Sequence, residues 1–286
     1  MRIIMVGDVV GEPGLLVLES RLPALIAEYA ADFTVVNGEN AAEGFGLTAE
    51  TLDRILAAGA DAVTGGNHIW EKREFWKVLA TGEKPVLRPA NYPSAPRAGL
   101  PEVGWPVVGS PELGLPGVGW LRLEKNGRSL LIVNLQGREL MTPIDCPFRC
   151  FDSIAASLEQ NPAGSGARSP CIIVDFHAES TEEKEALGYY LDGRASVVAG
   201  THTHIQTADE RLLPKGTAYI TDLGMTGAMN GVIGMDTEIC INRAYSQVAY
   251  RMECARPRSD KDCAIQGIIA ELGEDGRAVS IERINR

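Results

Sequence analysis

The chain has 286 residues, of which 45% are hydrophobic, and its formal net charge is −11. This size can bury one sizeable core, so we expect one domain spanning residues 1–286. The acidic balance argues against a stable complex with nucleic acid, whose backbone needs a basic surface. No stretch approaches the ~20 apolar residues of a membrane span, and the short apolar run before Asp8 differs from a signal peptide. We therefore expect a cytoplasmic protein with no membrane partner.

Short apolar runs alternate with helical patterns through the first third of the chain. The expected strands cover 3–6, 33–36 and 60–63. The expected helices cover 13–29, 49–58 and 69–79. Thr48 can cap the second helix and Gly59 can end it, whereas Pro23 predicts a kink in the first helix or its division into two. Strands that alternate with helices indicate parallel βαβ units in a layered sheet.

Residues 85–117 differ from what precedes them, because proline and glycine are dense and helical spacing is lost. Apolar residues persist there, so we expect an ordered, loop-rich excursion within the domain. Apolar runs at 118–124 and 129–135 then flank Asn126-Gly127. Asn-Gly between such runs is the strongest short signal of a β-hairpin.

The second half repeats the early pattern. A helix is expected to follow the polar loop at 138–150, and another begins at Thr181. Further strands are expected at 171–174, 195–199, 218–220, 246–253, 263–271 and 278–284.

Polar side chains that can bind metal follow five of these strands. All four histidines of the chain are among them, whereas structural histidines would scatter over the fold. The candidates are Asp8, Glu39, Asn40, Asn67, His68, His177, His202 and His204. Since the carboxyl ends of parallel strands meet at one sheet edge, we expect these residues to converge there.

The ligand types indicate which ions the site would take. Carboxylate, amide oxygen and imidazole suit Mn, Fe or Zn better than an ion that prefers thiolate. Two such ions ~3.5–4 Å apart can activate water and neutralise phosphate oxygens. The pattern therefore favours a two-metal phosphoesterase.

Five sequence blocks resemble those of the calcineurin-like metallophosphoesterases, and most closely their YmdB-like branch. They are GDVVG (7–11), NGEN (37–40), GGNH (65–68), DFHAE (175–179) and GTHTH (200–204). RPANYP (88–93), NLQGR (134–138) and IQTAD (205–209) extend the resemblance over nearly the whole chain. It implies an α/β fold, a layered β-sheet sandwich flanked by helices in α-β-β-α order. It also implies hydrolysis of small phosphodiesters, with 2′,3′-cyclic nucleotides as the expected substrates.

The resemblance assigns roles residue by residue. Metal 1 would be bound by Asp8, Glu39, Asn40 and His204. Metal 2 would be bound by Glu39, Asn67, His177 and His202, so that Glu39 bridges the pair. His68 would lie beside the ions without binding them and would protonate the leaving oxygen. The cofactors implied are two divalent or trivalent ions, with Fe or Mn favoured and Zn as the alternative.

Two positions depart from the broad superfamily pattern. The first block usually reads Asp-x-His, but Val10 occupies the histidine position, and the bridge is usually Asp rather than Glu39. Asn40 would supply the missing ligand, as in the YmdB-like branch. The sequence leaves the identity and occupancy of metal 1 open.

Neighbouring residues have more than one interpretation. Asp175, Glu179 and Asp222 could orient a ligand histidine, although Asp222 could equally cap a helix. Phe148, Tyr92 and Trp105 could line a substrate pocket or simply pack within loops.

Two other functions remain compatible with the sequence. The same site could hydrolyse phosphomonoesters, as a nucleotidase does. The chain could also be a regulatory metal-binding protein whose hydrolysis is incidental. The sequence does not fix the oligomeric state, and apolar residues within 98–120 are compatible with a homo-oligomer.

Overall fold

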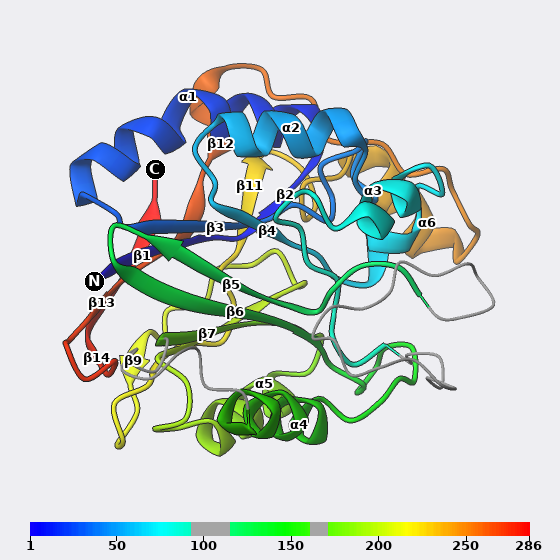
Figure 1. Cartoon of the computed structure of the whole chain (residues 1–286). Helices are drawn as coiled ribbons and strands as arrows, with labels where there is room; N and C mark the ends of the chain where they lie inside the picture. The colour runs from blue at the N-terminus through cyan, green and yellow to red at the C-terminus, as the bar shows by residue number, and fades with distance from the viewer. Residues whose placement is uncertain (93–114, 161–170) are drawn as a thin grey trace.

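Two β-sheets pack face to face between outer layers of helices (Figure 1). The computed structural model describes residues 1–92, 115–160 and 171–286. The first sheet has the order β14 (Ala278–Asn285), β13 (Gln266–Leu272), β1 (Arg2–Val6), β3 (Phe33–Asn37) and β4 (Ala62–Thr64). In it β1, β3 and β4 are parallel, whereas β13 runs antiparallel to its neighbours.

The second sheet has a parallel centre and antiparallel edges. Its order is β5 (Trp120–Lys125), β6 (Arg128–Gln136), β7 (Cys171–His177), β8 (Val197–Thr201), β10 (Ala218–Ile220) and β9 (Arg211–Leu212). A small third sheet joins β12 (Cys263–Ala264), β11 (Met225–Ala228) and β2 (Asp8–Val9).

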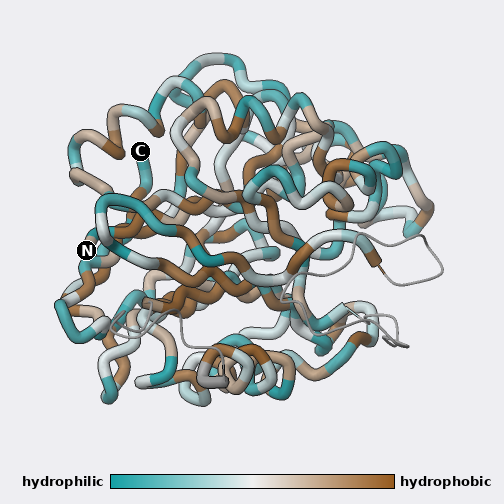
Figure 2. Tube along the Cα trace, in the orientation of Figure 1, coloured by the Kyte–Doolittle hydropathy of each residue, from teal (hydrophilic) through white to brown (hydrophobic). Residues whose placement is uncertain are grey.

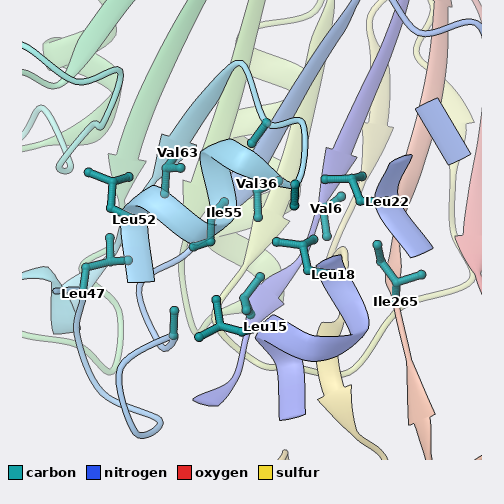
Figure 3. Close-up of a cluster of buried hydrophobic side chains, with 14 of the residues drawn as sticks. Val6, Leu15, Leu18, Leu22, Val36, Leu47, Leu52, Ile55, Val63 and Ile265 are labelled. Atoms are coloured by element: carbon teal, nitrogen blue, oxygen red, sulfur yellow. The ribbon is translucent and has the colours of Figure 1, made fainter. Parts of the chain in front are cut away.

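Helices cover the outer faces of the two large sheets. Helices α1 (Gly11–Tyr29) and α2 (Ala49–Ala57) cover the first sheet, and their buried side chains pack on its outer face (Figure 3). Helices α4 (Pro147–Gln160) and α5 (Thr181–Tyr190) cover the second sheet. The remaining helical segments are η1 (Asn67–Trp70), α3 (Phe75–Thr81), α6 (Thr237–Ser246) and η2 (Asp260–Asp262). The predicted α-β-β-α layering is confirmed.

The space between the two sheets changes from apolar to polar along the strands. Figure 2 shows hydrophobic runs along the central strands. In β7, buried Ile173 is followed on the same face by Asp175 and His177, and in β6 Ile132 is followed by Asn134. The crevice between the carboxyl ends of the strands is therefore lined with buried polar groups.

Two local predictions from the sequence are confirmed. Thr48 caps α2 in a capping box with Thr51. Asn126 and Gly127 have φ angles of 53° and 73°, as a type I′ hairpin turn requires.

Helix α1 is continuous through Pro23, so of the two outcomes predicted there the division into two helices is excluded, and buried Leu18, Leu22 and Leu25 hold both halves against the sheet. Two other local predictions were wrong. The helix expected at 69–79 is divided into η1 and α3. The Trp76 indole N–H donates to the Trp70 carbonyl at 3.1 Å, where a continuous helix would place a backbone amide.

The second of these, the strand expected at 246–253, is absent, and helix α6 occupies the preceding residues instead. The Asp236 side chain accepts from the Ile239 amide at 3.0 Å and begins this helix. The segment after it has no neighbouring strand within the described part of the chain.

The excursion predicted at 85–117 lies mostly outside the described residues, as does Trp105. At its start, Val86 pairs with Val63 and Leu87 pairs with Val118, and both Val86 and Leu87 are buried. None of the helices in the described residues combines the length and apolar character needed to cross a bilayer.

We expect Leu130→Ala to lower the free energy of unfolding by about 2–5 kcal/mol, because it leaves a cavity between the two sheets. Leu130 is fully buried on the inner face of β6. The control is Leu212→Ala in β9, where the side chain is 44% exposed. Urea unfolding measures both variants, and equal losses would contradict the assigned core.

Candidate functional site

The structure brings all seven predicted metal ligands to the carboxyl ends of the strands. Asp8 begins β2, Glu39 and Asn40 follow β3, Asn67 begins η1, His177 ends β7, and His202 and His204 follow β8. The side chains of Asp8, Glu39 and His177 have no exposed surface. Residues separated by up to 196 positions, from Asp8 to His204, therefore form one buried polar cluster.

One group of ligands surrounds the Nε2 atom of His177. Glu39 Oε1 lies 2.9 Å from it, Asn67 Oδ1 lies 3.0 Å from it, and His202 Nδ1 also lies 3.0 Å from it. The ligand atoms offered by Glu39, His177 and His202 all lie within 4.8 Å of one another. These are the four residues expected at metal 2.

A second group surrounds the side-chain amide of Asn40. Its Nδ2 atom lies 3.1 Å from His204 Nε2, 3.3 Å from Glu39 Oε1 and 3.5 Å from Asp8 Oδ1. Turning this amide over would put its oxygen at the same point, where it could bind a cation. Because Glu39 Oε1 faces both groups, its carboxylate lies between them, as a bridge would.

A buried relay fixes the ring of His177. The Nδ1 atom of His177 lies 3.0 Å from Thr201 Oγ1, which donates to Asp175 Oδ1 at 2.7 Å. Asp175 also accepts from Asn37 at 3.0 Å and from the Thr64 hydroxyl, both in the first sheet. With Nδ1 engaged in this way, Nε2 is left to face the ligand group.

The other two histidines are also held by one ring nitrogen each. His202 Nε2 lies 3.1 Å from Glu179 Oε2, so Nδ1 faces His177. His204 Nδ1 lies 2.9 Å from the carbonyl oxygen of Ile233, so Nε2 faces Asn40. Each ring therefore presents one nitrogen to the ligands and uses the other for its own orientation.

The backbone of this histidine loop is strained. His202 and His204 have φ angles of 98° and 64°, in the left-handed region that non-glycine residues rarely adopt. Asp222 holds the residue between them, since its Oδ2 accepts from Thr203 Oγ1 at 2.8 Å and from Thr203 N at 3.2 Å. Asp222 also pairs with buried Lys184 at 2.7 Å. Asp222 thus fixes the loop rather than a histidine ring.

Burial and close charges shift the pKa values of the ligands strongly. Burial raises the pKa of Asp8 to about 6, although His204 and His177 act in the opposite direction. Burial also opposes ionisation of Glu39, but the charge and hydrogen bond of His177 outweigh it and lower that pKa to about 2. Burial disfavours the charged form of His177, yet Glu39 raises its pKa to about 9. Burial and the charge of His177 lower the pKa of His202 to about 3. The cluster therefore attracts positive charge between its carboxylates.

His68 lies beside the ligands with its ring partly exposed. Its backbone N–H donates to Glu39 Oε2 at 3.0 Å, which ties it to the central carboxylate. Its side chain is 25% exposed, and its Nδ1 atom lies 3.4 Å from Glu71 Oε1. The ring also makes an edge contact with Phe45, with centroids 5.0 Å apart. A substrate could therefore reach this imidazole.

The residues present fit the metal ions that the resemblance implies. Oxygen and imidazole nitrogen donors converge, and such donor sets suit Mn, Fe or Zn. Gly66 keeps the space open, because a Cβ atom there would lie 2.2 Å from Glu39 Oε2 and 2.4 Å from His177 Nε2.

Two of the aromatic side chains that the sequence offered as pocket or packing residues contact another ring. Phe148 packs against Tyr190, and Tyr92 packs against Trp70, each with ring centroids 5.2 Å apart. The sequence did not indicate that Thr201 and the Ile233 carbonyl orient histidine rings, because neither is a usual metal ligand. Thr201 could have been found as a polar residue at the end of an apolar strand.

Comparison with known proteins shows relatives that match almost the whole chain. The sequence model of the YmdB-like protein family matches residues 4–284. The chain is 42% identical to the 2′,3′-cyclic-nucleotide 2′-phosphodiesterase of Bacillus subtilis, over 99% of this chain and 96% of that protein.

Two solved structures match the fold over its full length. A hypothetical protein from Thermus thermophilus is 37% identical, with a TM-score of 0.83 over 100% of this chain and 99% of that one. A novel phosphatase from Mycoplasma pneumoniae is 29% identical, with a TM-score of 0.84 over 100% and 93%.

We expect Thr201→Val to weaken metal binding by about 10–100-fold, because it removes the hydroxyl that orients His177. The matched control is Thr226→Val, since the buried Thr226 hydroxyl has no hydrogen-bond partner in the described part of the chain. Competition with a chromophoric chelator measures affinity, and circular dichroism checks folding. If both variants bind metal equally well, the relay through Thr201 has no such role.

Proposed function

The chain belongs to the YmdB-like protein family, and we propose that it is a metal-dependent phosphodiesterase acting on small phosphodiesters, with 2′,3′-cyclic nucleotides as substrates. The observation that carries this proposal is the position of Glu39, whose Oε1 atom faces two groups of nitrogen and oxygen donors. The Bacillus subtilis relative is named for this activity, as a 2′,3′-cyclic-nucleotide 2′-phosphodiesterase. A small substrate also suits a chain of net charge −11 better than a nucleic-acid polymer does.

We assign the two groups of donors to two ions. Asp8, Glu39, Asn40 and His204 would hold one, and Glu39, Asn67, His177 and His202 would hold the other. Fe or Mn suits this mixture of donors, with Zn as the alternative. When bound, the ions would activate a water molecule and neutralise charge on the phosphate oxygens.

The chain's own residues position the substrate and move the proton. In the reaction, a water oxygen forms a new bond to phosphorus and one bond from phosphorus to a ribose oxygen breaks. We assign to His68 the proton that this departing oxygen takes up, delivered from Nε2. Its Nδ1 atom faces Glu71, which leaves Nε2 for the substrate. The hydrogen bond from the His68 backbone amide to Glu39 holds His68, the proposed acid, at a fixed place beside the ligands.

We expect His68→Ala to retain both ions and to lose about 10²–10⁴-fold in turnover of a 2′,3′-cyclic nucleotide. The loss should be much smaller on bis(p-nitrophenyl) phosphate, because nitrophenolate departs without a proton. Steady-state rates on both diesters, with metal content measured in parallel, test this assignment.

Equal activity of wild type and His68→Ala on the cyclic nucleotide would remove the proposed acid. A wild-type rate on a nucleoside monophosphate that exceeds the rate on the cyclic diester would instead favour a phosphomonoesterase.

Substitution of single ligand residues should distinguish the two metal sites. We expect Asp8→Ala to lose one ion, Asn67→Ala to lose the other, and Glu39→Ala to lose both, because Glu39 Oε1 faces the side-chain donors of both groups. Asp275→Ala is the control, since that carboxylate is 62% exposed and lies beside Arg277. Mass spectrometry of metal content on purified protein gives the stoichiometry. Full metal content in Glu39→Ala would refute the bridge.

A further inference from the structure

A cavity of about 990 Å³ lies beside the proposed acid. Phe45 lines this cavity, and the Phe45 ring contacts the His68 ring with centroids 5.0 Å apart. Most of the other walls come from the first turns of α1 and α2 and from residues 251–257. Pockets for small-molecule ligands have volumes of about 300–1,000 Å³, so this cavity has the size of a binding site for part of a nucleotide.

The loop that carries Phe45 follows directly after the candidate ligands. It covers residues 41–47, between Asn40 and the cap of α2. The Ala42 amide donates to the Gly46 carbonyl at 2.9 Å, and the Phe45 amide donates to the Ala42 carbonyl at 3.0 Å. These two hydrogen bonds close the loop into a tight turn, which holds Phe45 close to the ligand group.

The backbone of this loop is strained and lies against the segment of the acid. Glu43, Gly44 and Gly46 have φ angles of 58°, 86° and 84°, all in the left-handed region. A Cβ atom on Gly46 would lie only 3.2 Å from the His68 carbonyl oxygen, so the two segments pack closely. Left-handed non-glycine residues such as Glu43 cluster at active sites and ligand contacts. The strain therefore fits a loop that positions Phe45 for binding.

The Phe45 ring is half-buried and has contacts on more than one side. It packs against the cluster of Val10, Met225 and Met235, contacts His68, and also lines the cavity. An aromatic ring held in place in this way is a suitable stacking surface for a nucleobase, because every base has a π-face.

The proposed reaction places the ribose of the substrate beside His68, because this residue protonates the ribose oxygen that departs. The base is bonded to the same ribose ring and must lie close to His68 as well. Within the described part of the chain, Phe45 is the aromatic residue in ring contact with His68, and the cavity begins there. We therefore propose that the cavity holds the nucleobase of the cyclic nucleotide, stacked on Phe45. The inference rests on the proposed function and adds a specificity-determining residue to it.

The charges around the cavity favour a neutral base over a second phosphate group. The lining residues include five glutamates and four basic residues, so the walls carry a net negative charge and repel phosphate. Three of the basic side chains are already paired with a lining glutamate, in the pairs Arg54–Glu12, Lys72–Glu43 and Arg256–Glu253. A nucleobase carries no net charge, so these walls do not exclude it.

Two substrates that differ only in the base test the proposal on the wild-type enzyme. One is adenosine 2′,3′-cyclic phosphate, and the other is methyl riboside 2′,3′-cyclic phosphate, in which a methoxy group replaces the base. We expect kcat/KM to be at least about tenfold lower on the methyl riboside, because stacking on Phe45 is lost. Equal values would overturn the base cavity while demonstrating hydrolysis of the cyclic phosphate. Hydrolysis of neither substrate would overturn the proposed function itself, and the inference with it.

Substitution of Phe45 tests whether this residue is the stacking surface. We expect Phe45→Ala to remove most of the difference in kcat/KM between the two substrates, and Phe45→Trp to retain it, because tryptophan keeps an aromatic face. The control is Tyr189→Ala on α5, where the side chain is 55% exposed and lies outside the cavity lining. If the difference persists in Phe45→Ala, the base is bound elsewhere and the proposal is overturned. Phe45→Leu, which keeps an apolar side chain against the cluster, replaces Phe45→Ala if circular dichroism shows that the latter is unfolded.

Discussion

The buried carboxylate of Asp175 is the interaction on which the arrangement of the site depends. A charge enclosed between two sheets must be hydrogen-bonded on all sides, or its desolvation costs several kcal/mol. Asn37 and Thr64 reach it from the first sheet and Thr201 from the second. Burial raises the pKa of Asp175 even so. Because these donors tie one sheet to the other, the same carboxylate sets the distance between the strand ends and the direction of the His177 ring.

The candidate metal ligands place like and unlike charges close together in a small buried volume. Asp8 and Glu39 are both fully buried, and imidazoles supply the nearest positive charge. Enclosing two carboxylates in this way lowers the free energy of unfolding. A cation that binds only the folded state stabilises that state and offsets the reduction. The strained His202 and His204 backbone, held by Asp222, adds to the same destabilisation.

The convergence of the candidate ligands was easier to predict from the sequence than the local structure was. Ligand types are chemical identities, and their positions after successive strands place them at one sheet edge in any parallel arrangement. The strand expected at 246–253 failed for the opposite reason. Its alternating pattern is genuine, but a strand exists only when another strand supplies hydrogen bonds, and no strand lies beside it in the described chain. Likewise, Pro23 does not divide α1 into two helices, because leucines on both sides of it pack against the sheet.

By itself the sequence determined the chemistry: which donors are present, the order of most strands and helices, and the turn at Asn126-Gly127. Only the tertiary structure decided which nitrogen of each histidine faces the ligands, that one Glu39 oxygen lies between two groups, and that Asp222 fixes a loop rather than a ring. These features depend on side chains that meet from distant segments. Distances and ring orientations follow from packing of whole layers, which no local pattern encodes.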